Sequence, residues 1–102
     1  MEIFDLDKMQ SFPYEERDKN VFYNTKEFKA RIIKLSSNEE IPKCEMGSFV
    51  IFYVLEGKAE LSVNQDKSII EAGMCIITEP ATFSLKTKNG VKIMGIQINK
   101  QI

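Results

Sequence analysis

The run FVIFYVL at residues 49–55 constrains the fold more than any other part of this sequence, because it is apolar over its whole length. β-Branched and aromatic side chains dominate the run, and its length is typical of a β-strand. Since alternate side chains of a strand point to opposite faces, both faces of this strand are apolar. One face carries Phe49, Ile51, Tyr53 and Leu55, and the other carries Val50, Phe52 and Val54. The run therefore predicts a central strand that is covered on both sides.

Shorter segments with strand-like composition surround this run, and turn residues separate them. They cover residues 3–6, 21–23, 27–36, 58–64, 68–71, 74–78, 83–87 and 91–99. Glu56-Gly57 predicts a hairpin between the central strand and residues 58–64, and Asn89-Gly90 predicts another between the last two strands. Residues 37–40 are typical of a polar loop, and Pro42 fits only a strand edge or a position outside the ladder. Many short strands with almost no helical period indicate an all-β, antiparallel sandwich or barrel.

The length of 102 residues predicts one domain over residues 1–102, with an N-terminal edge strand and loop at 1–24 and a barrel at 25–100. The net charge of -1 lacks the basic excess that is typical of nucleic-acid-binding proteins. No apolar run approaches the ~18 residues that span a bilayer, and the first residues lack the features of a signal peptide. We therefore expect a cytoplasmic protein with no nucleic-acid or membrane partner, in which Cys44 and Cys75 are reduced.

Two segments resemble the motifs of the cupin superfamily, whose members are small jelly-roll barrels. The sequence YVLEG at 53–57, continued by KAEL at 58–61, resembles the end of the first cupin motif. Ala72-Gly73, followed by MCII at 74–77 and by Pro80, resembles the second motif. The resemblance covers about residues 28–98 and implies an antiparallel double-stranded β-helix, or jelly-roll barrel. Because cupins commonly pair through their sheets, it also implies a homodimer.

The metal-binding positions of the cupin motifs hold other residue types in this chain. Counted from Gly57 and Gly73, they are Cys44 and Met46 (or Lys43 and Glu45 with the longer spacing), Val50 and Ser84. The sequence contains no histidine, which excludes imidazole as a base, an acid or a metal ligand. Manganese, iron, nickel and zinc prefer imidazole and carboxylate ligands. We therefore expect no bound metal, no cofactor and no catalytic residues of the cupin type.

The resemblance places any ligand in the mouth of the barrel, in an apolar pocket with a few polar groups. The residues expected to converge there are Cys44, Met46, Val50, Phe52, Ser84 and Lys86.

Three hypotheses about function follow from these observations. The first is a metal-independent module that binds a small molecule, assembles as a homodimer, or does both, without turnover. The second is an isomerase or epimerase for a sugar or sugar acid that uses Glu45, Tyr53 or Lys86 in place of histidine. The third is a copper(I) site with sulfur ligands from Cys44 and Met46, joined by other sulfur atoms if the barrel brings them near. Those additional sulfur atoms belong to Met74, Cys75 and Met94.

Overall fold

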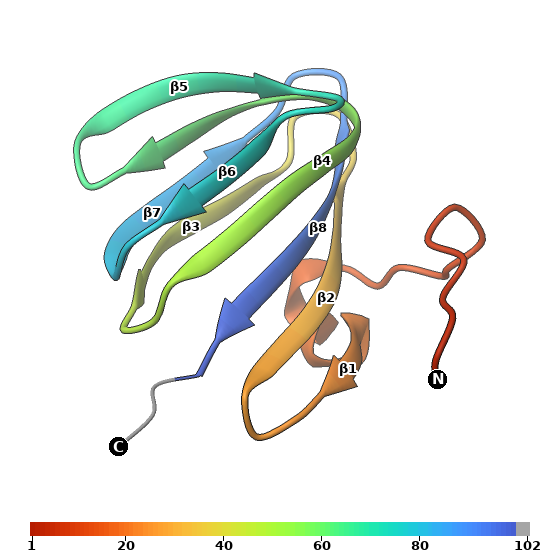
Figure 1. Cartoon of the computed structure of the whole chain (residues 1–102). Helices are drawn as coiled ribbons and strands as arrows, with labels where there is room; N and C mark the ends of the chain where they lie inside the picture. Colours follow the sequence, from red (N-terminus) through yellow and green to blue (C-terminus); the bar gives the residue numbers. More distant parts are fainter. Residues whose placement is uncertain (100–102) are drawn as a thin grey trace.

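Eight antiparallel strands and one short 3₁₀ helix make up residues 1–99, the part of the chain that the computed structural model describes (Figure 1). Residue 100, the end of the expected barrel, lies outside the described residues. The elements are η1 (Tyr14–Asn20), β1 (Val21–Asn24), β2 (Phe28–Leu35), β3 (Glu40–Met46), β4 (Val50–Val63), β5 (Asp66–Glu71), β6 (Cys75–Thr78), β7 (Ala81–Lys86) and β8 (Val91–Ile98).

The strands form two curved sheets that share β4. Sheet A contains β1, β2, β8, residues 50–57 of β4, and β6, in that order. Sheet B contains β3, β7, residues 58–63 of β4, and β5. We call the face of each sheet that is turned toward the other its inner face. Sheets that share one bent strand in this way enclose a single core.

The central strand is longer than the sequence predicted, because Gly57 does not form a hairpin turn. Leu55 is an extra residue in the pairing of β4 with β8, which makes a bulge two residues before Gly57. Gly57 has a φ of 81°, and a Cβ at this position would collide with the carbonyl oxygen of Gly90. Only glycine fits this conformation without strain. The expected hairpin is therefore wrong: the bulge bends one continuous strand from sheet A into sheet B.

The second expected hairpin, at Asn89-Gly90, is also wrong. This turn joins β7 in sheet B to β8 in sheet A, and the two strands pair with other partners. Thr87 holds the crossing, because its hydroxyl donates to the carbonyl of Lys58 (2.7 Å) and accepts from the Gly90 amide (3.0 Å). Turn residues thus marked where the chain reverses, but not which strands become neighbours.

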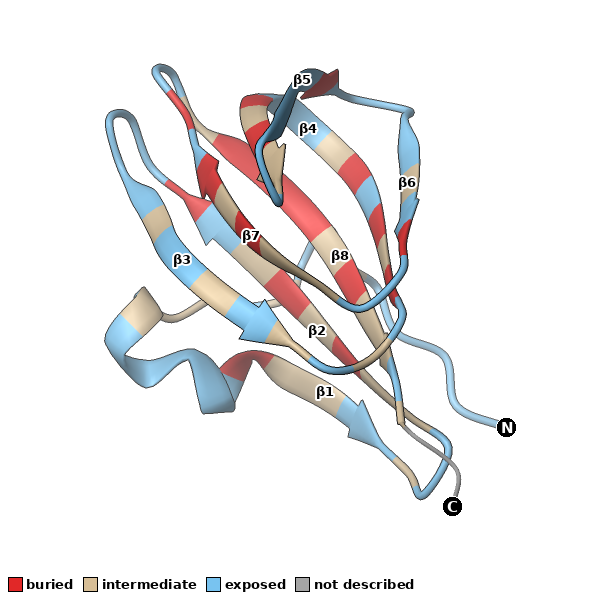
Figure 2. Ribbon diagram, turned by 90° about the vertical axis from the view of Figure 1, so that its left-hand side faces the viewer, coloured by how far each residue is buried: buried red, intermediate tan, exposed pale blue. Residues whose placement is uncertain are grey.

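The inner faces of the sheets form the hydrophobic core. Val54 and Ile93 are paired across β4 and β8, and both are fully buried. Opposite them, Leu61, Phe83 and Leu85 come from sheet B. Figure 2 shows the buried residues along β2, β4, β7 and β8, whereas β1 and β3 are largely exposed or half-buried. The two faces expected for the central strand differ in burial: Val50, Phe52 and Val54 are buried, whereas Phe49 and Tyr53 on the other face are exposed, so the expected cover on both sides is wrong.

Sequence patterns misplaced three elements near the ends of the sheets. The edge strand expected at residues 3–6 is wrong, since this segment has no strand structure. The charged residues EERDK at 15–19 lie in η1, a helix that the sequence did not predict. Residues 40–46 form the edge strand β3, which begins inside the loop expected at 37–40. Pro42 lies at an irregularity in the pairing of β3 with β7, as expected for a proline at a strand edge.

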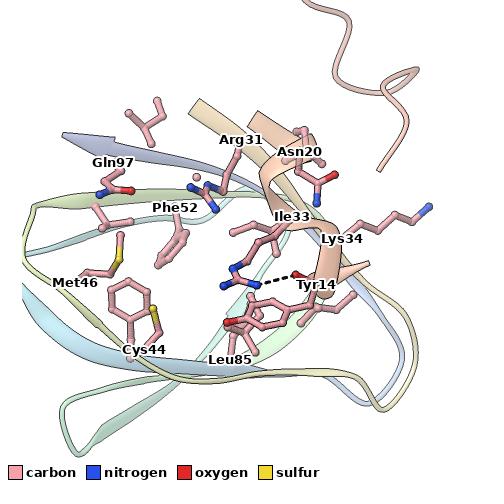
Figure 3. A pocket seen from close by; sticks show the side chains of 18 of the residues that line it. Tyr14, Asn20, Arg31, Ile33, Lys34, Cys44, Met46, Phe52, Leu85 and Gln97 are labelled. Carbon is pink, nitrogen blue, oxygen red and sulfur yellow. Dashed lines mark hydrogen bonds between the residues drawn. The ribbon is translucent and has the colours of Figure 1, made fainter. Parts of the chain in front are cut away.

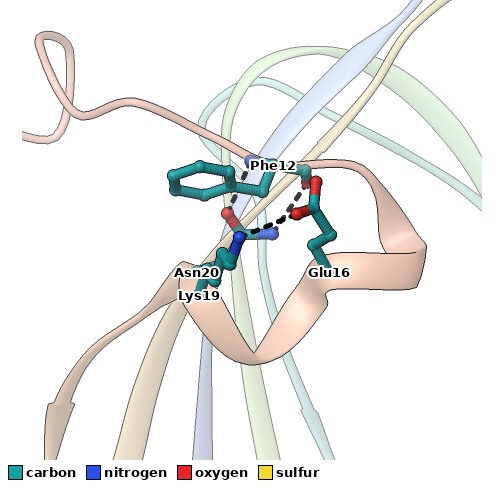
Figure 4. Close-up of polar contacts among 4 residues, drawn as sticks. All are labelled: Phe12, Glu16, Lys19 and Asn20. Atoms are coloured by element: carbon teal, nitrogen blue, oxygen red, sulfur yellow. Dashed lines mark hydrogen bonds and ion pairs between the residues drawn. The ribbon is translucent and has the colours of Figure 1, made fainter.

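The N-terminal segment is fastened to the outer side of sheet A and to η1. The buried Lys92 side chain donates from Nζ to the carbonyl of Leu6 at 2.6 Å. Asn20 accepts from the amide of Phe12 (2.8 Å) and donates to its carbonyl (3.0 Å), as Figure 4 shows. These bonds fix η1 beside β1 and β2 of sheet A, opposite the edge strand β3 of sheet B (Figure 2). Within residues 1–99, no helix has the length and apolar character needed to cross a membrane.

Candidate ligand-binding site

A cavity of about 260 Å³ lies between the two sheets. Its walls come from the inner faces, where Phe52 of sheet A meets Phe83 of sheet B edge to face, with ring centroids 5.5 Å apart. Leu61 and Leu85 extend this apolar wall. Residues of η1 line the opposite side of the cavity and supply most of its polar groups.

Four of the six residues that the sequence suggested line this cavity, as the close-up in Figure 3 shows for three of them. Cys44 and Met46 are two residues apart on β3, so both point to the inner face. Val50 and Phe52 have the same spacing on β4 and are buried. The pairing of Cys44 with Phe83 brings the edge strand β3 into the wall of the site.

Ser84 and Lys86 do not reach the cavity. On β7, the buried residues Phe83 and Leu85 point inward, and Ser84 and Lys86 alternate with them and point outward. Both line a separate hollow on the outer side of sheet B. Lys86 there lies 3.6 Å from the carboxylate of Glu60. Counting along the motif placed Ser84 in the site, but the register of β7 differs from that expectation by one residue.

Arg31 is a cavity residue that the sequence did not single out. It pairs with Gly95 on β8, and Gly95 pairs with Phe52 on β4, so the three residues form one row across the inner face of sheet A. Arg31 is half-buried and lines the cavity together with Ile33. In Figure 3 its side chain extends from β2 into the space above Phe52. Alternation along residues 27–36 indicated a half-exposed strand and grouped Arg31 with Lys29 on its more polar side, so nothing in the sequence pointed to a cavity residue.

A second guanidinium stands at the rim. Arg17 of η1 lies over the ring of Tyr14, 4.4 Å from the ring centroid, and donates to the Tyr14 carbonyl at 3.1 Å. Both residues line the cavity, together with Asp18 of the same helix. The Asn20 side chain holds the segment that carries them, and Lys19 lies 5.4 Å from the Phe12 ring centroid (Figure 4).

The sulfur atoms considered for copper(I) are divided between the two faces of the sheets. Cys44 and Met46 point into the cavity. Cys75 and Met94 each pair with Tyr53, on the outer face of sheet A. A site that combines all of these sulfur ligands is therefore not formed. Within residues 1–99, no group of three or more acidic or cysteine side chains is placed to hold a metal ion.

The residues proposed for an isomerase also lie outside the cavity. Tyr53 is on the outer face of sheet A, and Lys86 is on the outer face of sheet B. Glu45 is exposed and alternates with the inward residues Cys44 and Met46. The three polar groups thus occupy separate places on the surface.

Comparison with known proteins identifies the fold. No family profile and no curated protein sequence matches this chain. Among solved structures, TT1209 from Thermus thermophilus superposes with a TM-score of 0.84 at 17% identity, over 99% of this chain and 100% of that one. A cupin superfamily protein from Desulfitobacterium hafniense superposes with a TM-score of 0.74 at 11% identity, over 78% of this chain and 74% of that one. The chain has the cupin fold.

KdgF from a Halomonas species is a further structure of similar shape, with a TM-score of 0.71 at 12% identity over 79% of this chain and 76% of that one. The cupin fold confirms the expected antiparallel jelly-roll barrel and the resemblance carried by residues 28–98. It also places the cavity, since the inner faces of the two sheets are the inside of the cupin barrel.

Proposed function

We propose that this cupin-fold chain is a cytoplasmic, metal-independent module that binds a small molecule in the barrel cavity without turnover. The observation that carries the proposal is the cavity itself, which combines apolar walls with a few polar groups at one side. Small-molecule sites are usually built in this way. Its volume of 260 Å³ exceeds the ~150 Å³ of an engineered apolar cavity that binds benzene.

The positions of polar residues support binding without turnover. Glu45, Tyr53 and Lys86, which were the candidates for acid or base chemistry, all point away from the cavity. General acid–base catalysis needs a group within hydrogen-bond reach of the reacting atom. The isomerase hypothesis would therefore need acid–base groups other than these three residues.

Titration with a library of small fragments, followed by ¹H–¹⁵N NMR, tests the proposal. We expect at least one fragment to shift the amides of Cys44, Phe52 and Gly95 together. The variant Cys44→Phe places a ring in the cavity and should abolish these shifts. Lys43→Phe adds the same ring at the neighbouring exposed position and should leave them unchanged. Fragments that shift only residues outside the cavity, or that bind Cys44→Phe as well as the wild type, would contradict the proposal.

We also propose that the protein assembles as a homodimer through the outer face of sheet A. Apolar side chains from β4, β6 and β8 adjoin one another there, which we call the outer patch: Ile51, Tyr53, Cys75, Ile77, Met94 and Ile96. Ile77 is 68% exposed and Tyr53 is 39% exposed. A contiguous apolar surface of this kind favours an interface.

Sedimentation equilibrium of two matched variants tests the dimer. Ile77→Glu places a charge in the outer patch, and we expect it to be monomeric at micromolar concentration. Ile69→Glu makes the same change at an isoleucine of sheet B that is 54% exposed, and we expect it to remain dimeric. A wild-type protein that is monomeric at these concentrations would refute the proposed assembly.

A further inference from the structure

We infer that the ligand of the cavity is a small organic acid, with its hydrocarbon part against the apolar wall and its carboxylate on the guanidinium of Arg31. This inference rests on the proposed binding function and specifies the class of ligand. Three features carry it: the position of Arg31, the second guanidinium at the rim, and the apolar character of the wall.

Arg31 brings a permanent positive charge to the inner face of an apolar sheet. Its neighbours on that face are Lys29 and Ile33 along the strand and Gly95 across it. Within residues 1–99, the Arg31 guanidinium takes part in none of the ion pairs and side-chain hydrogen bonds of the protein. A guanidinium has five N–H donors in a planar fork, and partial burial without a partner is costly. An anion bound in the cavity would provide that partner.

Gly95 leaves space beside the Arg31 side chain. Because Gly95 has no side chain, the row Arg31–Gly95–Phe52 is open at its centre. A Cβ at Gly95 would lie 3.4 Å from Ile33 and 3.5 Å from Phe52, so these two side chains flank the opening. A planar carboxylate that reaches Arg31 would therefore extend its hydrocarbon part over the Phe52 ring.

The charges around the cavity favour an anion. Arg17 and Arg31 both line it, against the single carboxylate of Asp18. Lys34 is also part of the lining, but its amine points away from the cavity in Figure 3. The Tyr14 carbonyl and ring hold the Arg17 guanidinium in place. Arginine forks match carboxylates by two parallel hydrogen bonds.

The wall favours a hydrocarbon body over a sugar. Met46, Phe52, Leu61 and Phe83 belong to the apolar wall of the cavity. A sugar would bury several hydroxyl groups, each of which needs a hydrogen-bond partner. Asn20 and Gln97 supply the two carboxamides of the lining, and the Asn20 side chain already bonds the backbone of Phe12. A one-ring or short-chain acid instead leaves only its carboxylate to be satisfied, and the two arginines are placed to do so.

Calorimetric titration with benzoate and benzamide tests the inference, because the two molecules have the same shape and differ in charge. We expect benzoate to bind about tenfold or more tightly than benzamide, since a charged hydrogen-bonded pair replaces a neutral one. Arg31→Gln should remove that difference, and Arg31→Lys should restore only part of it, because lysine keeps the charge and loses the fork. Lys29→Gln removes a charge from the same face of β2 outside the cavity, and should change benzoate affinity less than threefold.

The outcomes separate this inference from the proposed binding function. One outcome is that benzamide binds in the cavity as tightly as benzoate, with both affinities unchanged in Arg31→Gln. In that case the proposed binding function stands, and the inference that the ligand is an organic acid is wrong. If phenyl phosphate binds far more tightly than benzoate, the carboxylate is also the wrong anion. If neither these compounds nor any neutral fragment binds in the cavity, both proposals fail. Thermal unfolding of each variant shows that it is folded, and Arg31→Lys keeps the test decisive if Arg31→Gln does not fold.

Discussion

Arg31 on β2 and Phe52 on β4 both pair with Gly95 on β8, so their side chains lie on either side of a residue that has none. This relationship opens a cavity in a face that is otherwise closely packed by branched apolar residues. It also joins the charged side of the cavity to its apolar wall. The strand register alone therefore builds a site with two chemically different ends.

Gly95→Ala tests whether glycine at this position provides space for the ligand or is required by the backbone conformation. The added methyl group would make ordinary van der Waals contacts with Ile33 and Phe52, at 3.4 and 3.5 Å. Replacing glycine at a compatible position stabilises a protein by about 0.4–1 kcal/mol. We expect urea unfolding to show unchanged or slightly increased stability, while NMR titration shows weaker ligand binding. Loss of stability with unchanged binding would contradict this role for Gly95.

Gly57→Ala should have the opposite effect on stability, because Gly57 makes the bend between the sheets. Its φ of 81° and its contact with the Gly90 carbonyl leave no room for a side chain. We expect a loss of at least ~2 kcal/mol in the free energy of unfolding, from backbone strain and displacement of the turn. Gly47→Ala is the control, since no atom lies within 4 Å of a Cβ there, and its effect should stay within ~0.5 kcal/mol. Equal effects of the two substitutions would argue against the bend.

Truncation of Ile93 tests the centre of the core. Ile93 is fully buried and pairs with both Ile33 and Val54. We expect Ile93→Val to cost about 0.5–1.5 kcal/mol and Ile93→Ala about 2–5 kcal/mol in urea unfolding, from lost burial and the cavity left behind. The exposed Ile69 is the comparison, and Ile69→Ala should change stability by less than ~0.5 kcal/mol. If Ile93→Ala leaves the free energy of unfolding unchanged, the sheets do not pack around Ile93 in this way.

Substitution by valine should change the free energy of unfolding in opposite directions at two equally buried threonines. The hydroxyl of Thr78 is buried and has no hydrogen-bond partner, whereas that of Thr87 bonds both Lys58 and Gly90. Thr78→Val removes an unsatisfied polar group and should raise the free energy of unfolding by up to ~1 kcal/mol. Thr87→Val breaks the crossing between the sheets and should lower it by about 1–3 kcal/mol. Chemical denaturation of both variants measures the difference, and effects of the same sign would contradict these hydrogen bonds.

The central strand and the fold class could be predicted from the sequence, because the apolar run at 49–55 and the short strands around it indicate an antiparallel barrel. The expected cover on both faces of the run is wrong, since Phe49 and Tyr53 are exposed. The connections could not. A glycine with positive φ makes a hairpin turn in one context and a bulge in another, and Gly57 makes the bulge. Similarly, Asn89-Gly90 reverses the chain between two sheets instead of within one. Local residues determine where the chain turns, and only the complete set of strand pairings determines which strands lie side by side.

The candidate site was predictable in part. Cys44, Met46, Val50 and Phe52 follow from alternation along two strands once the cupin resemblance aligns them. The prediction for Ser84 and Lys86 was wrong by one residue, and in a strand a shift of one residue moves a side chain to the other face. Arg31 and Arg17 belong to β2 and η1, outside both cupin motifs, and only the folded chain brings them to the cavity.

The most direct test of ligand binding inside the barrel uses protein labelled with ¹³C only at its five methionine methyl groups. Met46 lines the cavity, whereas Met94 lies on the outer face of sheet A. With the fragment that gives the largest chemical-shift changes, we predict intermolecular nuclear Overhauser effects at the Met46 methyl and none at Met94. Contacts at Met94 without contacts at Met46 would place the ligand on the outer patch and contradict binding in the cavity.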